Sequence, residues 1–184
     1  MRSICASLFG VAIVFWCGNT VLAAPPDIQS EVEANDTIET ATPIAFDISR
    51  CAIIDGSIGV AGDVDFFAFD APAGSRIWVL VDTGGMIDPL ATSLDSQLRL
   101  LDVDGVMTIE FDDDDGTGNG GDSSVETGLA SSIANARLTA GGTYFLRLSE
   151  FGDNDVLNPY RLFVVITHAL DDDEFRYNAN DTAA

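Results

Sequence analysis

The sequence has few cationic residues. Its 184 residues include no lysine, eight arginines and one histidine, against 30 acidic residues. Nucleic acid is therefore excluded as a partner, because phosphate binding requires a basic surface, and anionic membrane surfaces are disfavoured for the same reason. A net charge of −22 also repels itself in the compact state. Two explanations stay open: the acids provide solubility, or some of them are neutralised by bound divalent cations.

Long apolar runs are absent after residue 23, and the one before it predicts export. Residues 1–3 carry one positive charge, residues 4–17 are mostly apolar, and residues 21–23 have the small side chains of a cleavage site. This is the pattern of a secretory signal peptide, and a spanning helix would need roughly 20 apolar residues. We expect cleavage after Ala23 and a secreted or cell-surface product without membrane insertion.

Cysteine is too scarce for a disulfide framework. Cys5 and Cys17 lie in the expected signal peptide, so the mature chain of 161 residues keeps only Cys51, together with seven arginines and 30 acids. One cysteine cannot form an internal bridge, although export would permit one. The fold must depend on its core, which a chain of this length can build, with or without a bound metal.

Helical periodicity is also missing after Asp27, whereas strand patterns recur. We expect roughly eight strands, placed at residues 44–48, 51–58, 63–70, 76–82, 96–103, 106–111, 133–139, 143–149 and 160–167. Asp104-Gly105 between two of these segments is a hairpin signal. Many short strands separated by Gly, Asp and Pro predict an all-β, antiparallel, jelly-roll-like β-sandwich over residues 31–169.

Two motifs are similar to catalytic ones but lack the groups that such chemistry needs. Val81-Asp82-Thr83-Gly84 matches the core of the aspartic peptidase signature, which requires a second carboxylate to share a proton, and no second copy is present. Gly121-Asp122-Ser123 resembles an esterase nucleophile block, but His168, the only candidate base, has no Asp three residues before it. Cys51 is better explained as a small core residue. We expect no enzyme activity and no catalytic residues.

The acidic stretch within the long polar segment 112–129 is ambiguous. Asp112–Asp115 and Gly116 fail the EF-hand pattern, because alignment on the glycine puts Phe111 at the first ligand position. A solvated acidic loop is one interpretation. An irregular Ca²⁺ site that includes Asp122 is the other.

The segment that begins at Glu31 has a more informative pattern. Side chains two apart in an extended segment project to the same side, so Glu31, Glu33 and Asn35 would form a row of oxygen ligands, with Asp36 at the following turn. Ca²⁺ takes about six to eight oxygens, so a second strand must contribute to the shell. The candidate ligands are Glu31, Glu33, Asn35, Asp36, Asp63 and Asp65, with backbone carbonyls near Asp55.

Four segments, in this order, resemble the bacterial pre-peptidase C-terminal domain and its relative, the collagen-binding domain of clostridial collagenases. They are Glu33-Ala34-Asn35-Asp36-Thr37, Gly56-Ser57-Ile58, residues 62–69 (GDVDFFAF) and residues 141–148 (GGTYFLRL). The resemblance extends from Glu31 to about Thr167. It implies a secreted, non-catalytic, jelly-roll-like sandwich of the kind appended to extracellular peptidases and other exported enzymes.

The resemblance also bears on the metal site. In the collagen-binding relatives a Ca²⁺ site joins the N-terminal segment to the Asp-x-Asp strand, and Glu31, Glu33, Asn35, Asp36 and Asp63 match that pattern position by position. Asp65 matches the second acid of the strand motif. That acid either binds the ion or stabilises the fold. No collagen-contacting aromatic residues can be matched, so collagen binding is not carried over.

The tripeptide Asn-Asp-Thr occurs at residues 35–37 and again at 180–182. We therefore expect a linker at 24–30, one domain at 31–169, and an acidic linker with a candidate start of a second copy at 170–184. The expected function is a monomeric accessory module that binds or attaches to an extracellular protein or polymer. The alternatives are a structural or adhesion spacer from a tandem-repeat surface protein and an extracellular hydrolase.

Overall fold

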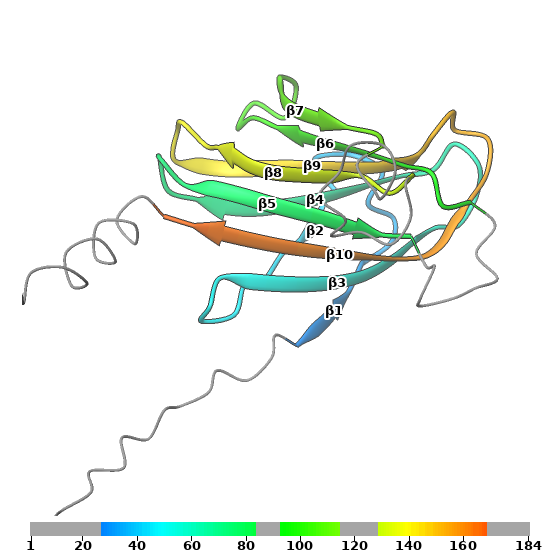
Figure 1. Ribbon diagram of the computed structural model, residues 1–184, viewed down its shortest axis with the longest axis horizontal. Helices are drawn as coiled ribbons and strands as arrows, with labels where there is room; N and C mark the ends of the chain where they lie inside the picture. The colour runs from blue at the N-terminus through cyan, green and yellow to red at the C-terminus, as the bar shows by residue number, and fades with distance from the viewer. Residues whose placement is uncertain (1–26, 84–92, 115–128, 169–184) are drawn as a thin grey trace, which may run out of the picture.

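The computed structural model describes residues 27–83, 93–114 and 129–168, which form ten strands and no helix (Figure 1). Sheet A has the order β1 (Ile28–Ser30), β3 (Cys51–Ile58), β10 (Leu157–Thr167), β5 (Arg76–Asp82) and β8 (Ser132–Arg137). Sheet B has the order β2 (Thr42–Pro43), β4 (Val64–Ala71), β9 (Gly142–Glu150), β6 (Ser96–Leu101) and β7 (Thr108–Asp112). The two sheets pack face to face. None of the described segments forms a helix long and apolar enough to cross a membrane.

The topology confirms the predicted all-β sandwich. Without the short strands β1 and β2, the sheet orders are β3-β10-β5-β8 and β4-β9-β6-β7, which is the arrangement of a jelly roll. Pairings among these eight strands are antiparallel. However, β1 pairs with β3 and β2 pairs with β4 in parallel, so both sheets are mixed.

One expected strand does not form. Residues 44–48 contain no strand in the structure, because the parallel edge strand ends at Pro43 and the chain then turns. The carboxylate of Asp47 accepts the backbone N–H groups of Ser49 and Cys51, at 2.8 and 2.9 Å. These bonds fix a turn rather than an extended segment. The hairpin at Asp104-Gly105 does form between β6 and β7, with Gly105 at a φ of 67° and its N–H donating to the carbonyl of Asp102.

The core lies between the sheets. Buried and partly exposed residues alternate along β3, β4, β5 and β10, as one inward face per strand requires. Tyr144, Tyr160, Phe67 and Leu146 are among the largest side chains that are fully buried. Each such side chain contributes about 1.5–3 kcal/mol to folding relative to exposure.

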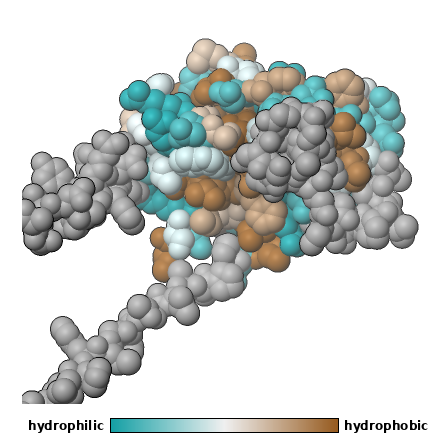
Figure 2. All heavy atoms as spheres, viewed as in Figure 1, coloured by the Kyte–Doolittle hydropathy of each residue, from teal (hydrophilic) through white to brown (hydrophobic). Residues whose placement is uncertain are grey.

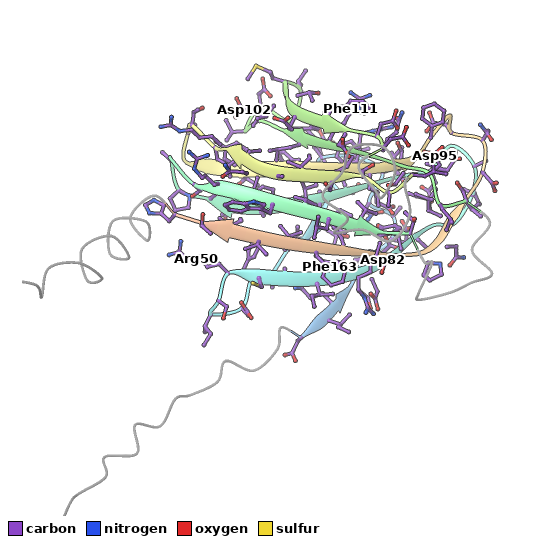
Figure 3. The ribbon with its side chains drawn as sticks, in the orientation of Figure 1. Arg50, Asp82, Asp95, Asp102, Phe111 and Phe163 are labelled. Atoms are coloured by element: carbon purple, nitrogen blue, oxygen red, sulfur yellow. The ribbon has the colours of Figure 1, made fainter. Side chains whose placement is uncertain are left out.

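The outer face of sheet A is partly apolar as well. Ile53, Trp78, Leu80, Phe163 and Val165 alternate with the core residues of β3, β5 and β10 and are half-buried. Figure 2 shows hydrophobic atoms between hydrophilic ones on this face, and Phe163 lies near its middle in Figure 3. The apolar residues on both faces of β5 agree with its internal place in the sheet.

Candidate metal centre

Three carboxylates meet near the end of β3 and the start of β4. Glu31 follows β1, Glu33 comes two residues later, and Asp65 lies on β4 in the other sheet. Each offers one oxygen, and these oxygens lie within 4.8 Å of one another. Glu31 is half-buried, Glu33 is exposed and Asp65 is fully buried. We refer to these three residues as the carboxylate cluster.

Sheet A fixes Glu31 in this position. The N–H of Glu31 donates to the carbonyl of Asp55 at 3.0 Å, which continues the parallel pairing of β1 with β3. Its carboxylate accepts the backbone N–H of Ser57 at 2.7 Å and lies 3.3 Å from the hydroxyl of the same serine. Gly56 is required between them, because a Cβ there would collide with the Glu31 carboxylate and the phenol of Tyr160. In the Gly56-Ser57 motif, the glycine thus leaves room for the Glu31 carboxylate and the serine binds it.

Tyr160 on β10 lies beneath the cluster. It is fully buried and pairs directly with Gly56 across the sheet. Its hydroxyl lies 2.6 Å from Oδ2 of Asp65 and 2.9 Å from Oε2 of Glu31. A phenol has one proton, so only one of these carboxylates accepts it at a time. Arg161, the next residue, pairs instead with Asp55, its Nη2 donating to Oδ2 at 2.9 Å.

Asn35 links two members of the cluster, Glu33 and Asp65. Its side chain is fully buried. With the amide oriented to satisfy its neighbours, its nitrogen donates to Oε2 of Glu33 at 2.9 Å and to Oδ1 of Asp65 at 3.0 Å. Its backbone carbonyl accepts the N–H of Phe66 at 2.9 Å, which ties the N-terminal segment to β4. The segment that holds two carboxylates is thus anchored to both sheets.

The cluster has strongly perturbed protonation. Burial, helped by the nearby charges of Glu31 and Glu33, raises the pKa of Asp65 to about 9, although the hydrogen bond from Tyr160 acts in the opposite direction. Burial also raises the pKa of Glu33, with added repulsion from Glu31. The pKa of Tyr160 is well above its usual value because of burial and the adjacent carboxylates. Without a cation, Asp65 therefore holds a proton at neutral pH.

The six candidate ligands divide into three groups. Glu31, Glu33 and Asp65 form the cluster, and Asn35 contacts two of its members. Asp36 and Asp63 lie near enough for their charges to raise the pKa of Glu33, but they are not part of the 4.8 Å group. The carboxylate of Asp63 accepts the N–H groups of Val64 and Gly59, at 3.0 and 3.3 Å. Their role as ligands stays a prediction.

The donor set fits a hard cation. It consists of carboxylate oxygens, an amide that could turn its oxygen toward an ion, and nearby backbone carbonyls such as that of Asp55. Such oxygen donors suit Ca²⁺, Mg²⁺ or Mn²⁺ and not the metals that prefer imidazole or thiolate. Tyr160 was not anticipated from the sequence, since 95 residues separate it from Asp65 and no local pattern marks it.

Among the described residues, the parts of the motifs that are similar to catalytic ones lie apart: Asp82 pairs with Arg161 at one end of sheet A, and His168 follows the end of β10 at the other. Asp82 ends β5, and the hydroxyl of Thr83 donates to the carbonyl of Leu94 at 2.9 Å. Cys51 and His168 are half-buried at or beyond strand ends. Gly84, Asp122 and Ser123 lie outside the described residues, as do the expected signal peptide and residues 170–184.

The acidic segment at 112–114 has a structural role at one position. The carboxylate of Asp112 accepts the N–H of Ser132 at 2.7 Å, which links β7 to β8. Asp113 and Asp114 lie near Asp95, whose pKa is raised to about 6 by burial first and then by the charges of Asp114, Asp113 and Glu150. Figure 3 shows Asp95 at the end of the sandwich where β6 begins. Whether this segment binds an ion stays open, because residues 115–128 lie outside the described ranges.

Comparison with known proteins agrees with the motifs. Residues 63–150 match the family model of the bacterial pre-peptidase C-terminal domain, which confirms the resemblance over that segment. No curated protein matches the chain.

Three solved structures are similar in fold. PliG of Aeromonas hydrophila, a periplasmic inhibitor of g-type lysozyme, is 14% identical with a TM-score of 0.46, over 78% of this chain and 100% of its own. PliG of Salmonella Typhimurium is 18% identical with a TM-score of 0.43, over 69% of this chain and 97% of its own. The pre-peptidase C-terminal domain of Bacillus anthracis collagenase is 12% identical with a TM-score of 0.39, over 78% of this chain and 98% of its own. At these values the likenesses carry no argument about function.

Proposed function

From the match of residues 63–150 to the bacterial pre-peptidase C-terminal domain, we propose that this chain is an exported, non-catalytic binding or attachment module stabilised by one Ca²⁺ ion. Domains of this family are accessory parts of exported peptidases. The export of this chain rests on the signal-peptide pattern of residues 1–23. The observation that carries the calcium proposal is the carboxylate cluster, which brings three acids within 4.8 Å across two sheets.

The cluster is unfavourable without a counter-charge. Asp65 is fully buried at an inward position of β4, where core residues such as Phe67 follow it. Burying a carboxylate without a compensating cation or proton costs several kcal/mol. A proton on Asp65 is one solution. A Ca²⁺ ion is the other, and it would neutralise Glu31 and Glu33 as well.

Calcium would also tie the N-terminal segment to the sandwich. Glu31 and Glu33 come from that segment, whereas Asp65 comes from β4, so an ion shared by all three crosslinks the two sheets. Extracellular modules commonly bind Ca²⁺ with a Kd on the order of 10⁻⁴ to 10⁻³ M. With a Kd of ~10⁻⁴ M and ~1 mM calcium, binding stabilises the fold by about 1.4 kcal/mol. For a domain of this size, that corresponds to a rise in Tm of about 3–6 °C.

Thermal denaturation tests the proposal. The Tm of the wild type is compared in chelator, in 1 mM CaCl₂, and in NaCl of matched ionic strength. The double variant Glu33→Gln, Asp65→Asn keeps the size of both side chains and should lose the calcium effect. The matched control is Glu110→Gln, which removes an exposed carboxylate on β7 and should keep it. The calcium site does not exist if NaCl reproduces the calcium effect or if the double variant retains it.

A further inference from the structure

The outer face of sheet B carries two arginines between two aromatic rings. The strand registers place Phe66 of β4 opposite Arg147 of β9, Arg147 opposite Arg99 of β6, and Arg99 opposite Phe111 of β7. Directly opposed residues point to the same face of a sheet, so the four side chains form one line across four strands. We name these four residues the arginine row. Figure 3 shows Phe111 at its outer end, on the edge strand β7.

Among the residues that the structure describes, the two arginines contact an aromatic ring and a hydroxyl group rather than a carboxylate. The guanidinium of Arg99 lies over the ring of Phe111, 4.3 Å from its centroid, and Nη1 of Arg147 donates to the hydroxyl of Ser149 at 3.1 Å. Within the described part of the chain, neither arginine forms an ion pair with a carboxylate. Like charges directly opposite each other destabilise a sheet. The chain has 30 acids and eight arginines, yet in its described ranges these two arginines face each other rather than a carboxylate.

A groove of about 560 Å³ lies over three members of the row, Phe66, Arg147 and Arg99, and Phe111 does not line it. Its volume is within the size range of small-ligand sites. Phe66, Arg99, Arg147 and Leu101 line it from sheet B, and Ile38 and Val106 line it from the N-terminal segment and the β6–β7 hairpin. The hairpin lies so close to the N-terminal segment that a Cβ at Gly105 would collide with the side chain of Ile38. The groove thus offers two guanidinium groups beside aromatic and aliphatic side chains, and its lining also includes acidic and hydroxyl side chains.

The chemistry of the groove restricts its ligand. A guanidinium binds a carboxylate through two parallel hydrogen bonds, and more strongly when it is partly buried. Burial, together with the charge of Arg99, lowers the pKa of Arg147, while Asp153 acts in the opposite direction. Asp36 and Glu39 also line the groove. With the net charge of −22, they would repel a polymer that carries a charge on every unit, but they tolerate one or two isolated carboxylates.

We propose that the arginine row binds an extended segment of a partner protein that carries one or two acidic side chains beside aromatic or aliphatic ones. The guanidinium groups of Arg99 and Arg147 take the carboxylates, while Phe66, Leu101 and Val106 contact the apolar side chains. This inference rests on the proposed binding role and gives that role a partner class.

The chain provides a matched control. Arg76 of β5 and Arg137 of β8 also lie directly opposite each other, on sheet A. Nη1 of Arg76 donates to the side-chain oxygen of Asn135 at 3.1 Å, and neither arginine lines the groove. Replacing Arg137 removes one charge from a similar cross-strand pair without touching the arginine row.

The test is calorimetric titration in 1 mM CaCl₂ with the acetylated and amidated heptapeptide Phe-Ser-Glu-Ser-Glu-Ser-Phe, whose acidic and aromatic side chains share one face when the peptide is extended. The same peptide with glutamine in place of glutamate is the ligand control, and trigalacturonate represents an acidic saccharide. We expect the wild type to bind the glutamate peptide at least about tenfold more tightly than the glutamine peptide. Arg99→Gln and Arg147→Gln should each weaken binding by about tenfold or more, which corresponds to about 1.4 kcal/mol, and Arg137→Gln should not change it.

Four results would overturn the proposal: no binding of the glutamate peptide, equal binding of the glutamine peptide, an equal loss in Arg137→Gln, or tighter binding of trigalacturonate. The calcium-dependent rise in Tm is measured on the same proteins. If that rise persists while peptide binding fails, only the arginine row is refuted. If peptide binding holds while the rise is absent from the wild type, only the calcium site is refuted.

Discussion

Replacing Tyr160 with phenylalanine removes one oxygen from beneath the carboxylate cluster and leaves the rest of a fully buried side chain unchanged. The hydroxyl lies 2.6 Å from Asp65 and 2.9 Å from Glu31. A hydrogen bond to a charged group contributes about 1.5–3 kcal/mol. We therefore expect Tyr160→Phe to lower the free energy of unfolding by about 2 kcal/mol. At about 2–4 °C per kcal/mol for a domain of this size, the Tm falls by about 4–8 °C.

Tyr144→Phe is the matched control. Tyr144 is also fully buried, but its hydroxyl donates to the carbonyl of Ala140 at 2.7 Å and accepts the N–H of the same residue at 3.1 Å. These partners are neutral, so the loss should be about 1 kcal/mol. They also do not titrate, so the loss should be the same at every pH.

The pH dependence separates the two variants. The pKa of Asp65 is about 9 in the folded state, above its ordinary value of 3.8. A carboxyl group whose pKa is raised by folding stabilises the fold at low pH, and this stability is lost as the pH rises toward the folded-state pKa. The Tyr160 hydroxyl lowers that pKa, so its removal raises the pKa further. The difference in Tm between wild type and Tyr160→Phe should therefore be nearly constant from about pH 6 to about pH 8 and widen as the pH rises through about 9.

Thermal denaturation followed by circular dichroism in chelator, at about pH 6, 8, 9 and 10, measures these differences. If Tyr160→Phe costs the same as Tyr144→Phe at every pH, the hydroxyl is not coupled to the carboxylates. The reasoning about the protonated cluster would then be wrong.

Three further predictions concern stability. In chelator, the Tm of the wild type should fall as the pH rises from about 6 to about 9, because the folded state keeps a proton on Asp65 that the unfolded chain releases. In the same melting assay, 1 mM Ca²⁺ should flatten this dependence, and a rise of Tm with pH in chelator would contradict the prediction. Gly56→Ala should lower the Tm and weaken the calcium effect, because its Cβ would collide with cluster side chains, whereas Gly59→Ala, whose Cβ would meet no atom within 4 Å, should do neither. Leu146→Ala, at a fully buried position, should lose about 2–5 kcal/mol in urea denaturation, and a loss below about 1 kcal/mol would refute its place in the core.

The longer strands were predictable because their alternation is visible in the sequence. In β4, the inward residues Phe67 and Phe69 alternate with half-buried or exposed ones, and the expected segment 63–70 differs from the observed strand by one residue at each end. Strands β1 and β2 have only three and two residues, which is too short for a period to show. Their parallel pairing depends on contacts with β3 and β4 that lie far along the chain.

The candidate site was predictable only in part. The alternating spacing of Glu31 and Glu33 indicated that their side chains act together, as they do in the cluster. Asp65 occupies a core position of β4, and an acid in that pattern is itself a signal that a counter-charge is needed. Tyr160 enters the cluster only through the register of β10 with β3. Three such registers together create the arginine row, and no local pattern reveals them.

The registers of β1 and β10 on β3 determine where flanking segments of the chain would attach to the sandwich. Ile28 pairs with Ile53 and Val165 pairs with Cys51, so the chain enters opposite the third residue of β3 and leaves opposite its first, with the end of β10 on the left in Figure 1. The carboxylate cluster lies beside Gly56, farther along the same strand, roughly 10 Å from the entry opposite Ile53 and roughly 17 Å from the exit opposite Cys51, at about 3.3 Å per residue. In a module attached in this way, both flanking segments join the same part of sheet A rather than opposite ends of the sandwich. Glu31 follows Ile28 by three residues, so a pull on the N-terminal segment would reach the calcium site soon after it opens the pairing of β1 with β3, whereas a pull on the end of β10 would act at the start of β3.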